Sequence, residues 1–175
     1  MSSMRLLIAA GALAAAAVTP VPASAAAAPG AVTCTGGEIA VTISPGLTLT
    51  PRAQWLSLAG PLGHCVAPGH PAISSGVLRA HGAFDGACPG PFAPADLELS
   101  ITWNDGSVST VTGARLHGDV KQWALLPGTV TSGPFTGDRL AALGRSRGLP
   151  DPWVIPCVAG GLNHLGTAVT AFAIG

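Results

Sequence analysis

The clearest pattern of hydrophobic and polar positions in this chain lies in the segment 97–112. In its first half, apolar side chains alternate with polar ones, and a period of two places the apolar groups on one face of a β-strand. We therefore predict a strand whose apolar face lies in the core. The residues of that face are Leu97, Leu99, Ile101 and Trp103.

The dipeptide Asp105-Gly106 follows this strand and favours a tight β-hairpin turn, because both positions of such a turn require a positive φ. With these two residues as the loop, Asn104 pairs with Ser107. This register puts Val108 in the core beside the apolar face of the first strand. The predicted cross-strand pairs are Trp103 with Val108, Ile101 with Thr110 and Leu99 with Thr112.

Short segments with the same alternation recur along the chain, and Gly or Pro separates them. The strand that follows the hairpin is interrupted by Pro127-Gly128, which predicts a sheet edge or a bulge. No amphipathic helix is long enough to connect parallel strands. About nine short strands of this kind predict an all-β fold, an antiparallel β-sandwich or barrel. The other predicted strands are 32–34, 38–43, 47–50, 53–60, 72–82 and 167–174.

A helix competes with a strand in the segment 138–147. Asp138 is a suitable helix cap, and Leu140 and Leu143 have helical spacing. The run is short, however, and predicted strands precede and follow it. The sequence leaves both structures open for this segment.

The N-terminal segment has the pattern of a secretory signal peptide. Arg5 precedes an uninterrupted apolar run over residues 6–18, and prolines and the sequence Ala23-Ser24-Ala25 follow it. The run is shorter than the roughly 20 residues that a membrane-spanning helix needs, and we predict cleavage after Ala25. Residues 1–25 are thus a predicted signal peptide. Residues 26–175 are a predicted single secreted domain with no membrane attachment after cleavage.

Charged residues are few and balanced, because the chain has 8 Lys and Arg against 8 Asp and Glu. There is no basic cluster to bind nucleic acid and no acidic run. Gly, Pro, Ser and Thr are abundant, which suits short strands joined by tight turns. We expect neither nucleic acid nor a cofactor to bind.

Four cysteines, Cys34, Cys65, Cys88 and Cys157, lie in the part of the chain expected to be secreted. An even number in an exported chain predicts two disulfides, and four cysteines allow three pairings. We favour Cys34 with Cys65 and Cys88 with Cys157, because each bond then ties a strand end to a later loop. The chain-entropy model gives about 3–4.5 kcal/mol of stabilisation for each closure. The other pairings stay open.

Three phrases of the sequence, at 34–37, 41–50 and 128–138, resemble those of a group of small secreted actinobacterial all-β proteins. The resemblance covers most of the mature chain. Its motifs form turns and strands and carry no chemistry, so the resemblance implies export and a β-fold without an activity. The chain departs from the group at 139–147, where the group has an alternating Thr and Val strand.

No metal-binding motif is present. The H-E-x-x-H and Gly-rich phosphate-loop patterns are missing, and no C-x-x-C pair could bind zinc or act in redox chemistry. His64, Cys65 and His70 form a loose group in a Pro- and Gly-containing segment, without the spacing of a metal site. We expect no metal.

Two pairs of residues could carry acid–base chemistry. His117 lies two residues from Asp119, but at a predicted turn the ordinary role of such residues is turn formation, and no nucleophile is specified. Asp96 and Glu98 share a strand face in the manner of a glycosidase pair, but a solvent-facing role beside Ser100 fits them better. We therefore expect that the protein is not an enzyme.

The chain has 4 tryptophans, and an exposed aromatic ring on a β-domain can stack on a sugar or contact a protein. Alternation assigns Trp103 to the core. Trp153 lies in a Pro-rich loop near Cys157 and is the candidate binding residue, although packing under a disulfide competes with that role. We expect an exported, non-enzymatic protein with a structural or interaction role at the cell exterior. The alternative is a carbohydrate-binding or protease-inhibitor-like module, whose partner is a cell-wall glycan or another protein.

Overall fold

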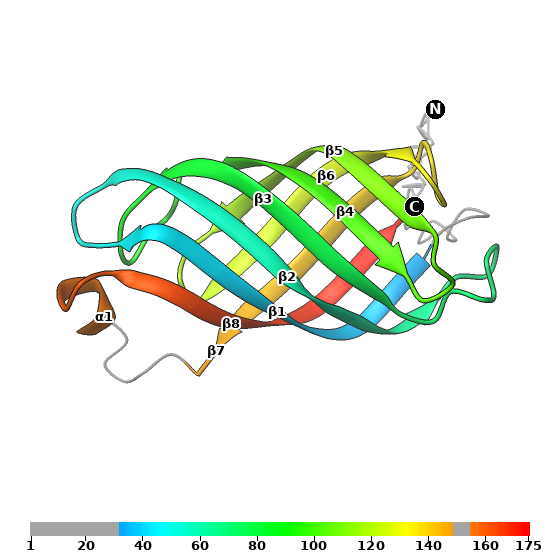
Figure 1. Ribbon diagram of the computed structural model, residues 1–175, viewed down its shortest axis with the longest axis horizontal. Coiled ribbons are helices and arrows are strands. Elements are labelled where there is room, and N and C mark those ends of the chain that lie inside the picture. The colour runs from blue at the N-terminus through cyan, green and yellow to red at the C-terminus, as the bar shows by residue number, and fades with distance from the viewer. Residues whose placement is uncertain (1–31, 149–154) are drawn as a thin grey trace, which may run out of the picture.

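The computed structural model describes residues 32–148 and 155–175. Its strands form a closed antiparallel barrel in which each strand pairs with the next and the last returns to the first (Figure 1). A short helix, α1, precedes the last strand. The elements are β1 Val32–Leu47, β2 Arg52–Val66, β3 Gly76–Gly86, β4 Ala95–Trp103, β5 Val108–Gly118, β6 Gln122–Ser132, β7 Arg139–Arg147, α1 Ile155–Val158 and β8 Leu162–Ile174.

The predicted all-β class is confirmed, and of the two architectures the barrel is the correct one. The described strands are fewer and longer than predicted, because Gly and Pro interrupt the pairing locally without ending a strand. In β1, Gly36 and Gly37 still pair with Gly63 and Leu62 of β2. The predicted turn at 44–46 lies within β1, where the pairing with β8 shifts register. The predicted bulge at Pro127-Gly128 is confirmed by a register shift between β6 and β7.

The inside of the barrel is the hydrophobic core. Along β3 buried and exposed residues alternate without exception, as a strand between a packed interior and solvent requires. Among the described residues, three polar side chains are buried, namely Gln54, Ser109 and Thr167. Each makes a hydrogen bond inside the barrel wall; for example, the Thr167 hydroxyl donates to the carbonyl of Ile39.

The central hairpin forms, but the predicted register is wrong by one residue. The backbone N–H of Trp103 donates to the carbonyl of Ser107, so the loop has three residues, 104–106. Ile101 therefore lies opposite Ser109, and Val108 is 45% exposed where burial was predicted. The apolar face of β4 is buried as predicted, and Trp103 is 2% exposed.

Asn104 explains the longer loop. Its side-chain oxygen accepts hydrogen bonds from the backbone N–H groups of Ser74 and Ser75, at 2.8 and 3.0 Å, and its side-chain nitrogen donates to the carbonyl of Ala72 at 2.8 Å. The side chain thus holds the loop between β2 and β3 against the hairpin turn. Because these partners are about 30 positions away in the sequence, no local pattern could reveal them.

The segment 138–147, open between helix and strand, forms β7. Leu140 is fully buried, whereas Leu143 is 52% exposed, so the two leucines lie on opposite faces as in a strand. β7 pairs with β6 on one side and β8 on the other. These two ladders satisfy its backbone groups and exclude the helix.

Both predicted disulfides are present. Cys34 and Cys65 face each other across β1 and β2, and Cys88, after β3, is bonded to Cys157 of α1. Two disulfides indicate an oxidising environment. The predicted signal peptide 1–25 lies outside the described residues. Within the described ranges, no helix is long and apolar enough to cross a membrane.

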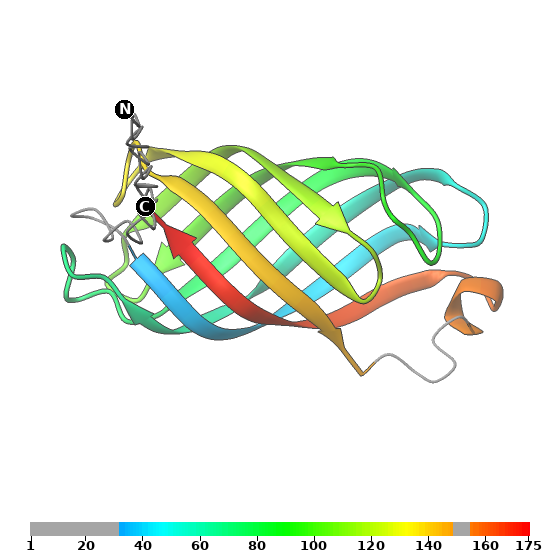
Figure 2. The same ribbon diagram turned by 180° about the vertical axis from the view of Figure 1, so that it is seen from behind.

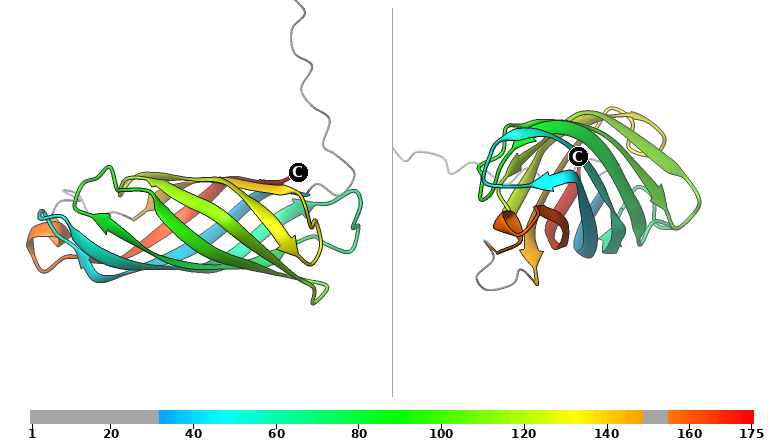
Figure 3. Two further views of the ribbon diagram at one scale, coloured as in Figure 1. Left: turned by 90° about the horizontal axis from the view of Figure 1, so that it is seen from above. Right: turned by 60° about the vertical axis from the view of Figure 1, so that its left-hand side comes forward.

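The barrel has two distinct ends. Figures 2 and 3 show α1 at one end and the C-terminus at the other. Trp103, at the C-terminal end, packs edge to face against Phe135 and Phe172, with ring centroids 5.5 and 6.5 Å apart. Trp123 begins β6 near the α1 end. We call these the Trp103 end and the Trp123 end.

Candidate functional site

Apolar side chains of the described strands pack the barrel interior. The internal cavity near the Trp123 end measures about 30 Å³, far less than a pocket for a small-molecule ligand requires. Apolar side chains such as Val41, Leu58 and Phe84 line most of it. A candidate binding site in the described part of the chain must therefore lie on the outer wall.

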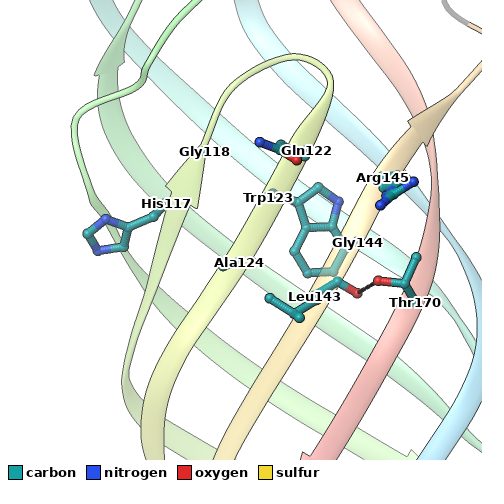
Figure 4. Close-up of a pocket in the computed structure, with 9 residues that line it drawn as sticks. All are labelled: His117, Gly118, Gln122, Trp123, Ala124, Leu143, Gly144, Arg145 and Thr170. Carbon is teal, nitrogen blue, oxygen red and sulfur yellow. Dashed lines mark hydrogen bonds between the residues drawn. The ribbon is translucent and has the colours of Figure 1, made fainter.

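A recess of about 320 Å³ lies on the outer wall over β5 to β8 (Figure 4). Its polar side chains are those of His117, Gln122, Arg145 and Thr170. Arg145 makes no ion pair with any described residue. Figure 4 shows that His117 points away from the Trp123 indole, so His117 forms an edge of the recess and does not converge with the other groups.

Trp123 lies where β6 approaches β7, directly opposite Gly144. A Cβ atom on Gly144 would lie 2.1 Å from the indole ring, so the ring occupies the space that a side chain at Gly144 would need (Figure 4). The indole is partly buried, and its Nε1–H has no hydrogen-bond partner in the described structure. A buried donor without a partner is uncommon, and it marks this part of the wall as incompletely satisfied.

The recess continues into an apolar groove of about 520 Å³ that crosses β6, β7, β8 and the start of β1. The two hollows share Ala124, Leu143 and Thr170. We call the combined hollow the furrow. Thr170 lies where the pairing of β7 with β8 shifts register, and its hydroxyl donates to the carbonyl of Leu143 at 3.2 Å. A bulge of this kind redirects side chains and here breaks the regular surface of the wall.

A second cluster lies on the outer wall over β2, β3 and β4. Trp55 is 51% exposed, and its ring lies 5.6 Å from that of His81. His81 Nε2 lies 3.2 Å from a carboxylate oxygen of Glu98. Arg79, on the same face of β3, lines a recess of about 480 Å³ with His81 and Glu98. We call these four residues the aromatic strip.

Ser57, His81 and Glu98 stand in a row, because Ser57 pairs with His81 across β2 and β3 and His81 pairs with Glu98 across β3 and β4. These residue types occur in hydrolase triads. In the described structure, however, no hydrogen bond joins Ser57 to His81, and the backbone N–H groups of these strands are used in the sheet ladders. A serine without an activating base and without oxyanion donors is a poor nucleophile.

Two other residues that the sequence offered for acid–base chemistry, Asp96 and Asp119, make ordinary structural contacts. Asp96 pairs with Arg115 at 2.8 Å, with both side chains solvent-exposed. The carboxylate of Asp119 accepts hydrogen bonds from the backbone N–H groups of Lys121 and Gln122, which is the predicted turn role. Asp96 and Asp119 thus act in a surface ion pair and a turn, respectively.

His70 packs edge-on against Phe135, with ring centroids 4.9 Å apart, and Cys65 is in its disulfide. The described residues contain no group of His, Cys, Asp or Glu able to hold a metal. Trp153, the predicted binding residue, lies outside the described residues.

The sequence patterns did not predict the furrow or the aromatic strip. The alternation of β2 already places Trp55 on the face opposite Leu56 and Leu58, but only the register brings it near His81 and Glu98. Comparisons with protein-family models, curated protein sequences and solved structures found no match.

Proposed function

We propose that this chain is an exported, non-enzymatic interaction protein of the cell exterior, which binds its partner through the outer wall of a rigid barrel. The observation that supports this most directly is the filled interior, with an internal cavity of about 30 Å³. A carrier that encloses its ligand needs a cavity of several hundred Å³. The two disulfides fit the oxidising compartment that export would provide.

Export has a direct test. Expression of the full chain in a secreting bacterial host should give protein in the medium whose N-terminal sequence starts at Ala26. Retention of the intact N-terminus inside the cells would contradict export.

The aromatic strip favours carbohydrate as the ligand. A half-exposed indole provides an apolar face for a sugar ring. His81, Glu98 and Arg79 beside it provide donors and acceptors for hydroxyl groups. The paired strands of the barrel wall hold these groups in fixed positions, which lowers the entropic cost of binding.

Titration of the purified protein with soluble peptidoglycan fragments and chitin oligosaccharides, followed by tryptophan fluorescence, tests this function. We expect a saturable change that Trp55→Ala weakens at least tenfold, because an exposed aromatic anchor carries much of such binding energy. Leu49→Ala is the matched control, since Leu49 is 55% exposed and lies outside both the strip and the furrow. Unchanged binding by the Trp55 variant, or no binding at all, would contradict carbohydrate recognition by the strip.

The non-enzymatic part of the proposal is tested at the Ser57, His81 and Glu98 row. We expect no turnover of ester, peptide or glycan substrates. Turnover that Ser57→Ala abolishes would overturn this part, and it would identify the row as catalytic.

A further inference from the structure

We propose that the furrow over β6, β7, β8 and β1 binds a free fatty acid, with the carboxylate at Arg145 and the hydrocarbon chain in the apolar groove. This site lies on a part of the wall that does not include the aromatic strip. The inference therefore does not depend on carbohydrate binding.

The groove part of the furrow selects a hydrocarbon chain. Small side chains, Ala141, Ala171 and Ala173, form its floor, and Leu126 and Leu143 stand beside them with 43% and 52% exposure. Ala141 pairs with Ala173 and Leu143 with Ala171, so these groups form a continuous apolar surface along two paired strands. Covering it with a hydrocarbon removes apolar surface from water.

A peptide or a sugar fits this groove poorly. The barrel is closed, so every strand is paired on both sides and no free edge can pair with an extended peptide. The polar groups of a peptide backbone or a sugar would lose their hydrogen bonds to water and find few partners in an apolar groove. A hydrocarbon chain has no such requirement.

The recess part of the furrow supplies the complementary charge. Arg145 lies two residues after Leu143 on the same outer face of β7, so it lines the recess next to a residue that the recess shares with the groove. No carboxylate lines either hollow, and Arg145 has no ion-pair partner among the described residues. Gln122 pairs with Arg145 across β6 and β7 and adds an amide donor. A guanidinium beside an amide is a suitable site for a carboxylate.

The spacing along β7 suits an extended hydrocarbon chain. Ala141 lies four positions before Arg145, which corresponds to about 13 Å along a strand. The ligand class is thus an anionic head joined to a linear apolar tail that lies across the outer wall.

Isothermal titration calorimetry with monomeric sodium laurate, and in parallel with dodecyltrimethylammonium, tests the proposal on the intact mature protein. The two probes share one hydrocarbon chain and differ in head-group charge. We expect saturable binding of laurate and at least tenfold weaker binding of the ammonium compound. Arg145→Gln should weaken laurate about tenfold and leave the ammonium compound no weaker, whereas Leu143→Ser should weaken both.

Matched controls separate these effects from misfolding. Arg139→Gln removes an exposed arginine from the same strand outside the furrow, and Leu49→Ser changes a leucine that is 55% exposed elsewhere. Both should bind laurate like the wild type, and all variants should unfold at the same denaturant concentration. Equal binding of the two probes, an unaffected Arg145 variant, or no laurate binding would overturn the proposal. Binding only to anionic phospholipid vesicles would overturn it as well, because it would identify a membrane surface as the ligand.

Discussion

Two tryptophans at opposite ends of the barrel differ in burial and in whether the indole N–H has a hydrogen-bond partner. Trp103 is 2% exposed, and its Nε1–H donates to the hydroxyl of Ser109 at 2.9 Å. That hydroxyl in turn donates to the carbonyl of Pro134 at 2.8 Å. Trp123 is partly buried against Gly144, and its Nε1–H has no partner in the described structure.

The difference between the two ends is consistent with the proposed division between a stabilising end and a binding surface. At the Trp103 end, aromatic rings pack together in the core, and the buried indole N–H and the Ser109 hydroxyl both have hydrogen-bond partners. At the Trp123 end, the outer wall has a recess beside a glycine, a bulge and an indole donor without a partner in the described structure. Binding regions are commonly the parts of a protein that packing stabilises least.

The largest expected effect is at Trp103. Trp103→Ala should lower the free energy of unfolding by about 3–5 kcal/mol, because it removes a fully packed aromatic ring from the core. Trp123→Ala should cost clearly less, since its ring is only partly buried. Denaturant unfolding of both variants measures the difference, and equal losses would remove the distinction between the two ends.

The next effect tests the contact between Gly144 and the indole. Gly144→Ala should destabilise the protein by about 1–3 kcal/mol, because the new methyl group occupies the space of the ring. Gly63→Ala is the control, since a Cβ there has no atom within 4 Å. In a Trp123→Ala background the cost of Gly144→Ala should disappear. A cost that persists there would show that the indole is not its cause.

A smaller effect is expected for the hydrogen-bond chain. Ser109→Ala should cost about 1–2 kcal/mol, because it leaves the Trp103 Nε1–H and the Pro134 carbonyl without their partner. Ser57→Ala, on the exposed face of β2, should change the unfolding free energy little. Denaturant unfolding measures both serine variants. Equal unfolding free energies would show that the hydrogen bonds of Ser109 do not stabilise the Trp103 end.

The smallest effect concerns the turn beside Trp103. The side-chain hydroxyl and the backbone N–H of Ser107 both donate hydrogen bonds to the carboxylate of Asp105. These bonds lower the pKa of that carboxyl, and the hydroxyl has the larger effect. Ionised Asp105 therefore stabilises the fold above its unfolded-state pKa, and this contribution is lost as the pH falls through the lower folded-state pKa.

Ser107→Ala should raise the pKa of Asp105, which NMR titration of the side-chain carboxyl carbon can follow. Ser57→Ala should leave this titration unchanged. An unaltered Asp105 titration in the Ser107 variant would assign the lowered pKa to another cause.

Several features could be predicted from the sequence because short-range physics decides them. The alternation from Leu97 to Trp103 determines which face of β4 is buried, because apolar side chains leave water wherever a strand offers a packed face. The even number of cysteines predicted two disulfides, and the favoured pairs Cys34–Cys65 and Cys88–Cys157 are the ones present. Turn residues marked most boundaries between strands.

Only the tertiary structure decided the remaining features, because their causes lie far apart in the sequence. Asn104 binds the loop before β3, and this lengthens the turn and moves Ser109 inward to the Trp103 indole. β7 is a strand because β6 and β8 lie on either side of it. The furrow and the aromatic strip exist because barrel closure sets the register between distant strands, and their residues follow no common sequence pattern.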